Sequence, residues 1–353
     1  MSSSPIRLTW RTREAPPEIC GAALTTLREG DPCATLIEGD NLAALAALAD
    51  TRGGQASLVY LDPPFFTGRQ HRQVTRRREA SGVFSREEQP AFDDRWDGLH
   101  AYLTALEARL HYARALLAPH GSLVLHVDPK TSHYAKVLLD ELFGPDCFAS
   151  EIVWRYRRWP SKTQNFQRVH DVLLRYVRDP DVEPRFCQLY EPLAASTRAT
   201  WGTRKQRAVV SDGRRQRSSV SDAESPGAPL GDVWEIGIVA PVARERTGYP
   251  TQKPEALLTR LVSALTHPGD WIVDPYVGSG TTLAVAAALG RSAHGIDQNP
   301  EALRLCEARL TKRGITASRL RLSTEQERAP LSKASPSPAG ASAKQPSKLP
   351  IAS

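Results

Sequence analysis

The chain has 353 residues, of which 41% are hydrophobic, enough for a real core in one large domain or two small ones. Lys and Arg total 46 against 39 Asp and Glu, a basic balance that suits a polyanionic partner such as nucleic acid. The five cysteines form no CxxC pair and no zinc spacing, and the apolar stretches are too short to span a bilayer. We therefore expect a cytoplasmic protein with no signal peptide, no membrane contact and no metal.

Taken in chain order, the apolar periodicity predicts alternating strands and helices. Short apolar runs predict buried strands at residues 35–37, 57–61, 122–127, 271–273 and 293–296. Apolar residues at helical spacing predict helices at residues 41–49, 99–117, 132–143, 254–266, 281–289 and 300–310. Two more runs, 152–154 and 172–177, are expected to pair as antiparallel strands. This alternation indicates an α/β domain in which helices cover both faces of a mostly parallel sheet.

Four polar segments fall outside this pattern. Residues 1–30 are expected to be a flexible N-terminal segment, and residues 325–353, rich in Ser, Pro, Ala and Lys, are expected to be disordered. Residues 67–94 are polar and Arg-rich, and we expect 67–85 to be poorly ordered without a partner. Residues 184–232 are irregular, with seven basic residues between positions 198 and 217. Loops this long are usually functional or disordered.

The first motif is Asp62-Pro63-Pro64-Phe65, directly after the predicted strand 57–61. A strand that ends in this way places a carboxylate at the carboxyl edge of the sheet, where α/β proteins bind ligands. The prolines fix φ and remove two backbone donors, so a stiff loop of acceptors remains beside an aromatic ring. Such a loop suits an exocyclic amine, which has two N–H donors and a face for stacking. The structural alternative is a proline-rich turn with a helix-capping Asp62.

The second motif follows strand 271–273 and opens helix 281–289. It consists of Asp274, Pro275, Tyr276, Val277, Gly278, Ser279, Gly280, Thr281 and Thr282. Glycines in such a turn let the backbone approach a ligand closely. About seventeen residues beyond Gly280, strand 293–296 ends in Asp297. An acid at this place typically binds ribose hydroxyls.

Two other interpretations of this loop fail on detail. A dinucleotide fingerprint needs a third glycine where Leu283 stands, and a P-loop needs lysine where Thr281 stands. A glycine-rich turn without a ligand stays open, but Asp297 disfavours it. His126 lies within an apolar strand and is interpreted as a satisfied core histidine rather than a metal ligand.

Three basic runs indicate contact with DNA, because Arg and Lys bind phosphates and exposed rings stack on bases. One run alternates cations with rings between Trp154 and Arg168, a second follows the Asp-Pro-Pro-Phe loop, and a third lies within residues 198–217. For any single run a solvated charged face is as good an interpretation. The candidate DNA-binding residues are Arg69, Arg72, Arg76, Arg155, Arg157, Arg158, Lys162, Arg204 and Lys205.

With these motifs in this order, the sequence resembles the permuted β group of DNA amino-methyltransferases, and within it the Mod-like adenine-N6 enzymes. In that group the catalytic motif precedes the cofactor motif, and a target recognition region separates them. Residues 92–96 match its Phe-x-Asp-x-Trp segment, and residues 121–128 match its Gly-Ser-Leu strand with His-Val-Asp. The resemblance covers roughly residues 34–180 and 245–312. Two departures, Phe65 for Tyr and Tyr276 for Phe, both keep an aromatic face.

The resemblance implies a Rossmann-like fold with a mostly parallel seven-stranded sheet, S-adenosylmethionine as cofactor and double-stranded DNA as substrate. It implies a catalytic half at 31–183, a target recognition region at 184–232 and a cofactor-binding half at 233–324. The implied cofactor residues are Asp40, Asn41, Asp62, Thr251, Gln252, Lys253, Asp274, Tyr276, Gly278, Ser279, Gly280, Thr281, Thr282 and Asp297. A homodimer and a cognate restriction endonuclease are further partners that it suggests.

The expected reaction methylates N6 of adenine in a flipped-out nucleotide, with Asp62, Pro63, Pro64 and Phe65 as the catalytic residues. N4 of cytosine is the nearest alternative, because the same geometry serves both amines, although a serine at position 62 would favour it. Methylation of RNA or of a protein amide is disfavoured, since those enzymes usually carry asparagine there. A non-catalytic DNA-binding module on the same fold is a further alternative.

Overall fold

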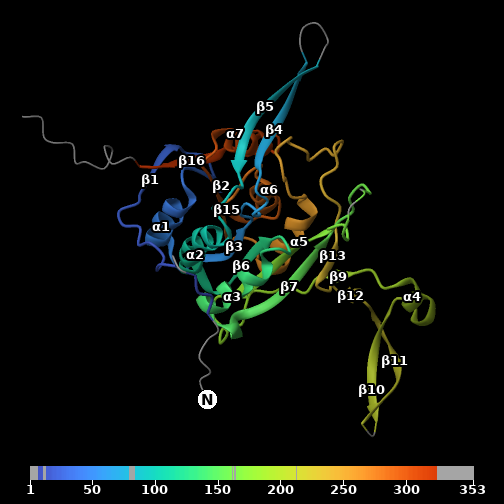
Figure 1. Ribbon diagram of the computed structural model, residues 1–353. Coiled ribbons are helices and arrows are strands. Elements are labelled where there is room, and N and C mark those ends of the chain that lie inside the picture. The colour runs from blue at the N-terminus through green and yellow to red at the C-terminus, as the bar shows by residue number, and fades with distance from the viewer. Residues whose placement is uncertain are drawn as a thin grey trace, which may run out of the picture. The chain divides into compact units, whose positions relative to one another are not determined.

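A ten-stranded sheet organises the chain in the computed structural model, which describes residues 7–10, 13–78, 84–160, 162, 164–211 and 213–323 (Figure 1). In spatial order its strands are β1 (Leu24–Arg28), β16 (Ala317–Leu322), β2 (Asp31–Glu38), β15 (Ser292–Asp297), β14 (Trp271–Asp274), β3 (Ala56–Leu61), β6 (Leu117–Val127), β8 (His170–Val177), β7 (Phe148–Arg155) and β13 (Val233–Glu235). The predicted tail, 325–353, lies outside the described residues.

The prediction of a mostly parallel sheet is confirmed, and the strand count is larger than expected. The seven strands from β2 to β7 run parallel except β8, which is antiparallel to both neighbours, as predicted for its pairing with β7. Strands β1, β16 and β13 add to the edges and make ten. The sequence did not predict these edge strands because none has the apolar run of a central strand. β1 and β13 are short, and β16 alternates Leu with Arg.

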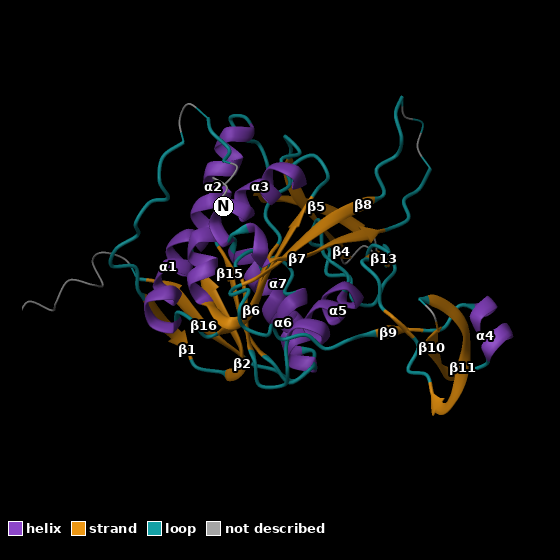
Figure 2. Ribbon diagram, turned by 90° about the horizontal axis from the view of Figure 1, so that it is seen from below, coloured by secondary structure: helices purple, strands orange, loops and turns teal. Residues whose placement is uncertain are grey.

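Three helices pack on each face of the sheet (Figure 2). One core includes apolar side chains of α1 (Asn41–Arg52), α2 (Leu99–Leu116) and α3 (Ser132–Phe143). The other includes those of α5 (Glu255–Leu265), α6 (Thr281–Ala288) and α7 (Pro300–Thr311). A short 3-10 helix (Pro145–Cys147) follows α3. Every predicted helix is present, with ends that differ by a few residues.

Successive residues of the central strands belong to opposite cores, because side chains alternate across a strand. Leu58 packs with the α5–α7 core, and Val59 packs with the α1–α3 core. All six residues of β3 are buried, which explains why its sequence is a continuous apolar run rather than an alternating one.

Two antiparallel hairpins occupy segments that we expected to be irregular. β4 (Gln70–Arg78) pairs with β5 (Phe84–Asp93), and β10 (Arg204–Ser211) pairs with β11 (Arg214–Glu224). The expectation is wrong for these described stretches, because antiparallel pairing satisfies the backbone without any apolar face to reveal it in the sequence. The second segment also holds α4 (Ala195–Trp201) and the short pair β9 (Tyr190–Glu191) and β12 (Ala228–Pro229).

Part of the N-terminal segment that we expected to be flexible is tied to the domain. β1 joins the sheet through β16, and Trp10 packs against the α1–α3 core. The Arg13 guanidinium bonds both Glu107 of α2 and Glu141 of α3, each at 2.7 Å. These contacts join residues more than ninety positions apart, so a local reading of the sequence misses them. In the described part of the chain, no helix is long and apolar enough to cross a membrane.

The two motifs meet because β3 and β14 are neighbours in the sheet. Val59 pairs with Val273 in parallel register, so both strands end at the same edge. Asp62 follows β3 directly, and Asp274 is the last residue of β14. Residues separated by more than two hundred positions in the chain therefore lie at the carboxyl ends of adjacent strands, where α/β sheets bind ligands.

Candidate active site

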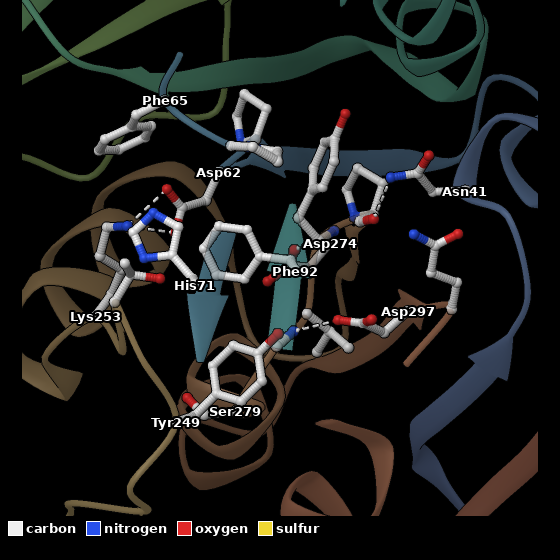
Figure 3. A pocket seen from close by; sticks show the side chains of 18 of the residues that line it. Asn41, Asp62, Phe65, His71, Phe92, Tyr249, Lys253, Asp274, Ser279 and Asp297 are labelled. Atoms are coloured by element: carbon white, nitrogen blue, oxygen red, sulfur yellow. Dashed lines mark hydrogen bonds and ion pairs between the residues drawn. The ribbon is translucent and has the colours of Figure 1, made fainter. Parts of the chain in front are cut away.

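A cavity of about 310 Å³ opens at this edge of the sheet (Figure 3). Of the predicted catalytic and cofactor residues, all except Gly280 line it. They are Asp40, Asn41, Asp62, Pro63, Pro64, Phe65, Thr251, Gln252, Lys253, Asp274, Tyr276, Gly278, Ser279, Thr281, Thr282 and Asp297. The fold thus brings five separate stretches of sequence to one pocket.

Asp94 holds the catalytic loop in place. Its buried carboxylate accepts hydrogen bonds from the backbone N–H groups of Phe66 at 2.7 Å and Thr67 at 2.8 Å. Phe66 adopts φ of 54°, a conformation that costs a non-glycine residue energy and persists only where surroundings fix it. The Phe-x-Asp-x-Trp segment therefore acts through its Asp94, which clamps the turn that follows Phe65.

Lys253 forms an ion pair with Asp62. Its Nζ lies 2.7 Å from Oδ1 and 2.6 Å from Oδ2, and both side chains are largely buried. The same ammonium group sits 4.7 Å from the ring centroid of Phe65. Sequence analysis placed Lys253 only among the cofactor residues, and the structure puts it against the catalytic carboxylate as well.

The glycine loop is shaped by one hydrogen bond and one close packing contact. Gly278, at φ of 48°, donates its N–H to Asp297 Oδ2 at 3.1 Å. Gly280 directly precedes α6 at φ of 75°, and a Cβ there would meet Cys306 Sγ of α7 at 2.1 Å. Gly280 is therefore needed for helix packing, which explains why it does not line the cavity as predicted.

Two carboxylates, the buried Asp274 and the partly buried Asp297, face the cavity without a cation. Asp274 accepts from Thr282 Oγ1 at 2.5 Å and from the Tyr276 N–H at 3.0 Å, but burial still raises the pKa of Asp274 to about 7. Burial also raises the pKa of Asp297, despite bonds from backbone N–H groups. The described residues form no salt bridge with either group. A cationic ligand with ribose hydroxyls would supply the missing partners.

Some predicted cofactor residues also have structural roles. Asp40 caps α1 by accepting from the N–H groups of Leu42 and Ala43. Asn41 donates to the Pro275 carbonyl at 2.9 Å and accepts from Arg109. Gln252 bonds Thr247 and the Glu245 carbonyl within its own loop. They line the cavity, yet much of their bonding capacity is used by the protein.

Sequence reasoning missed several lining or supporting residues. Tyr249 covers Gly278, and Phe92 stacks on His71 with ring centroids 4.5 Å apart, which gives the cavity an aromatic wall. Arg309 of α7 donates to the Ser279 carbonyl and to Thr281 Oγ1, so it holds the glycine loop. Phe92 belongs to the Phe-x-Asp-x-Trp segment, which could have pointed to it, whereas Tyr249, His71 and Arg309 belong to no motif.

A larger groove of about 1230 Å³ adjoins the cavity and shares Phe65, Tyr249 and Lys253 with it. Among the predicted DNA-binding residues, Arg69, Arg72 and Arg158 line this groove. Arg155 instead pairs with Glu235 of β13, and Arg157 and Lys162 are exposed. Arg204 and Lys205 lie exposed on β10, and Arg76 lies on β4 with a side chain outside the described set.

The strand order, the glycine loop between β14 and α6, and an acid at the end of β15 together define a Rossmann-like methyltransferase whose cofactor is S-adenosylmethionine. The cavity residues fit this cofactor, since the two carboxylates without a cation suit its positive charge. A family model described as DNA methylase matches residues 56–308, so the chain belongs to the N6/N4 DNA methylase family. It is an S-adenosylmethionine-dependent DNA methyltransferase, and DNA is its substrate.

Curated relatives agree with this family. Type II methyltransferase M.HpaI of Haemophilus parainfluenzae is 27% identical over 267 residues, which cover 76% of this chain and 72% of that protein. DNA adenine methyltransferase YhdJ of Escherichia coli K12 is 27% identical over 284 residues, covering 80% and 84%. The solved structure of PvuII DNA methyltransferase, described as cytosine-N4-specific, matches with a TM-score of 0.52 at 16% identity. The match covers 80% of this chain and 89% of that one, and it supports the fold.

Proposed function

We propose that the chain methylates N6 of adenine within a specific sequence of double-stranded DNA. The observation that carries this proposal is Asp62 at the end of a proline-stiffened loop in the cofactor cavity. A carboxylate is a stronger acceptor than a hydroxyl, because charge-assisted hydrogen bonds are roughly twice as strong as neutral ones. The relative YhdJ, a DNA adenine methyltransferase, supports adenine as the target base.

In the proposed reaction the target nucleotide leaves the duplex and enters the cavity, because a paired base hides its amine. Phe65 stacks on the base, while Asp62 and the Pro63 carbonyl accept the two amine hydrogens. These bonds localise the nitrogen lone pair and stabilise the positive charge that forms on nitrogen. The glycine loop and Asp297 would hold the cofactor, which would supply the methyl group to the positioned amine.

The groove beside the cavity is the proposed DNA-binding surface. Its arginines offer phosphate contacts, and the loop between β7 and β8 carries two rings that are almost fully exposed, Trp159 at 91% and Phe166 at 99%. Rings this exposed, next to Arg157 and Arg158, suit stacking on unpaired bases. Residues 184–232 are the proposed target recognition region, since base-edge contacts must come from outside the shared core.

The target atom is tested with labelled cofactor and unmethylated bacterial DNA, digested to nucleosides after the reaction and separated. We expect label in N6-methyl-2′-deoxyadenosine. Label in N4-methyl-2′-deoxycytidine alone would show that cytosine is the target. Replacing residues 184–232 should change or abolish the methylated sequence while cofactor binding survives. A chimera that still modifies the original site would contradict the proposed recognition region.

We also expect, as part of this proposal, that the enzyme works in the cytoplasm, where chromosomal DNA and the cofactor meet. A homodimer and a cognate restriction endonuclease are the proposed protein partners. Light scattering of the purified chain tests the first, and co-purification from its native cells tests the second. A strictly monomeric active enzyme would remove the dimer from the proposal.

A further inference from the structure

A buried histidine lies behind the catalytic carboxylate. His126 follows Leu125, the residue of β6 that pairs with Leu61, so it stands in the next strand beside Asp62. It is completely buried, with Nδ1 3.8 Å from Asp62 Oδ1 and 2.9 Å from the Tyr60 hydroxyl. The rings of Phe65 and Trp154 enclose it at centroid distances of 5.4 and 5.5 Å. The proposed reaction gives this titratable side chain no role.

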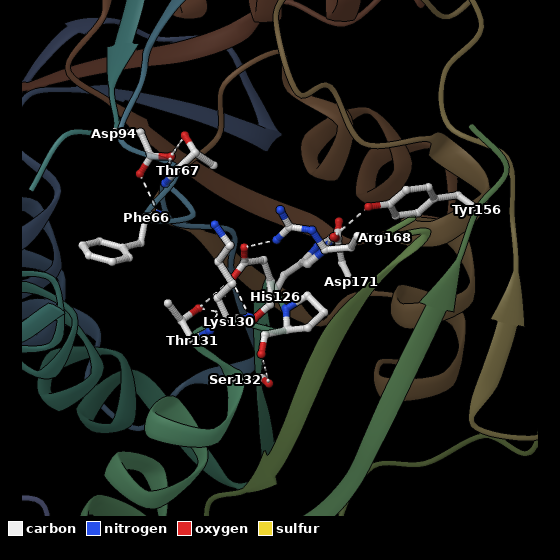
Figure 4. Close-up of polar contacts among 12 residues, drawn as sticks. Phe66, Thr67, Asp94, His126, Lys130, Thr131, Ser132, Tyr156, Arg168 and Asp171 are labelled. Carbon is white, nitrogen blue, oxygen red and sulfur yellow. Dashed lines mark hydrogen bonds and ion pairs between the residues drawn. The ribbon is translucent and has the colours of Figure 1, made fainter. Parts of the chain in front are cut away.

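Asp171 determines how the imidazole is oriented (Figure 4). Its Oδ2 lies 3.4 Å from His126 Nε2, and its Oδ1 accepts from the Tyr156 hydroxyl at 3.0 Å. Burial alone would raise the pKa of Asp171, but His126 and the charge of Lys253 lower it, so the group stays anionic. An anionic carboxylate only accepts, so the imidazole gives it Nε2–H, and the Nδ1 lone pair accepts from the Tyr60 hydroxyl with Asp62 Oδ1 3.8 Å away.

This chain of groups leads from the cavity to the adjoining groove. Asp62 lines the cavity, whereas Asp171 and Tyr156 line the groove. The charged and titratable groups around His126 are Asp62 and Tyr60 from β3 and its loop, Asp171 from β8 and Lys253 across Asp62. A base held between two carboxylates is well placed to carry a positive charge for a short time.

We propose that His126, oriented by Asp171, is a positioning residue that takes the proton of the methylated amine from Asp62 and passes it toward the groove. This inference rests on the proposed role of Asp62. Methyl transfer leaves a cationic secondary amine, whose N–H bond breaks as an O–H bond forms on Asp62. That O–H bond breaks in turn as N–H forms at His126 Nδ1. The Nε2 proton then moves to Asp171 and on to water in the groove, which leaves neutral His126 protonated on Nδ1. After the product leaves, the Nδ1 proton is lost to water in the cavity by way of Asp62, and Nε2 takes a proton back from the groove through Asp171, which restores the starting tautomer.

The ion pair explains why Asp62 needs such a relay. The Lys253 ammonium contacts both carboxylate oxygens. A proton received on Asp62 has to leave before this ion pair forms again. The carboxylate is thereby restored to the ionised form that accepts the next amine.

The test is the pH dependence of single-turnover methyl transfer to unmethylated bacterial DNA, with S-adenosylmethionine saturating at every pH, in the wild type, His126→Gln and Asp171→Asn. We expect an acid limb in the wild type, because protonated His126 cannot accept. In His126→Gln that limb disappears and the plateau rate falls by about 100-fold, the lower end of general acid–base effects. In Asp171→Asn the limb moves to lower pH, because the imidazolium loses its counter-charge. A purely structural role would lower the rate equally at every pH.

His294→Gln is the matched control. His294 also lies in the sheet, where it accepts from Trp271 Nε1 at 2.9 Å, and we expect a wild-type pH profile. In cofactor-free protein, the NMR titration of the His126 imidazole should move to lower pH in Asp171→Asn, a readout independent of activity. An unmoved titration, or a wild-type profile in His126→Gln, would overturn the relay. If Asp62→Asn kept activity, the proposed role of Asp62 would fail as well, whereas an inactive Asp62→Asn beside a normal His126→Gln would refute the relay alone.

Discussion

Three carboxylates stand at the ends of β3, β14 and β15, and only the one that follows β3 is paired with a cation among the described residues. Asp62, after β3, is paired with Lys253 through both oxygens. Asp274, at the end of β14, and Asp297, at the end of β15, are held by hydrogen bonds, and burial raises the pKa of both. The protein thus supplies a cation, Lys253, for Asp62, which is proposed to bind the substrate amine. Asp274 and Asp297 have no such cation and can face the positive charge of the cofactor. One edge of a sheet is thereby divided into a substrate end and a cofactor end.

Removal of Asp62 should separate the two ends most clearly. We expect Asp62→Ala to lower the methyl-transfer rate by about 10³-fold, the upper range for loss of one preorganised electrostatic group. Calorimetry should show cofactor affinity within a few-fold of wild type, because Asp274 and Asp297 are intact. Full activity in this variant would mean that the catalytic assignment is wrong. Asp62→Asn keeps the volume of the side chain and removes its charge, so a similar loss of rate in this variant would show that the charge, and not the packing, is required.

Removal of the cation should show what the ion pair contributes to stability. Lys253→Met leaves Asp62 ionised and partly buried without a partner, and breaking such a pair costs about 3 kcal/mol of unfolding free energy. Chemical denaturation measures the loss. Glu235→Gln breaks the exposed Arg155–Glu235 pair and serves as control, with an expected cost below about 1 kcal/mol. Equal costs for both variants would contradict the importance of burial.

At the cofactor end, Asp297→Ala should weaken S-adenosylmethionine binding by about 10- to 100-fold, since a hydrogen bond to a charged group contributes about 1.5–3 kcal/mol. The fold should change little, because Asp297 lies at a strand end. Calorimetry measures the affinity, and circular dichroism checks the fold. Asp62→Ala is the matched control, and unchanged affinity in Asp297→Ala would refute the placement of the ribose.

The smallest expected effect is a pH dependence of cofactor binding. The pKa of Asp274 is about 7 in the free protein, and a cationic ligand favours its ionised form. Binding should therefore release a proton near neutral pH and weaken several-fold as the pH falls from about 7.5 to 6. Titration calorimetry in two buffers of different ionisation enthalpy measures the proton release. Asp274→Asn should flatten the dependence, and an unchanged slope in that variant would point to another group.

Local patterns in the sequence were sufficient to predict the central strands and to locate the two loops that carry the motifs. Asp62 and Gly278 each follow a continuous apolar strand, and such strands are recognisable because both faces are buried. Their meeting at one edge required the resemblance to a permuted family, because no local pattern tells which strands are neighbours.

The remaining features depend on contacts between distant segments. Asp94 clamps Phe66 from 28 positions away, and Lys253 meets Asp62 across 191 positions. His126 reads as an ordinary core histidine in an apolar strand, and its neighbours Asp62 and Asp171 become visible only when β6 is placed between β3 and β8. The arginine-rich hairpin β4–β5 was missed because strand pairing can occur without an apolar pattern.

The order of strands also bears on how the enzyme is made. β14 and β15 lie between β2 and β3, although they are synthesised well over two hundred residues later. A nascent chain that ends before Trp271 would carry an apolar sheet with two strands missing from its middle, and such exposed edges favour aggregation. We therefore expect translation to yield an inactive, chaperone-dependent intermediate until the last quarter of the chain emerges, so that premature release gives insoluble rather than partly functional protein.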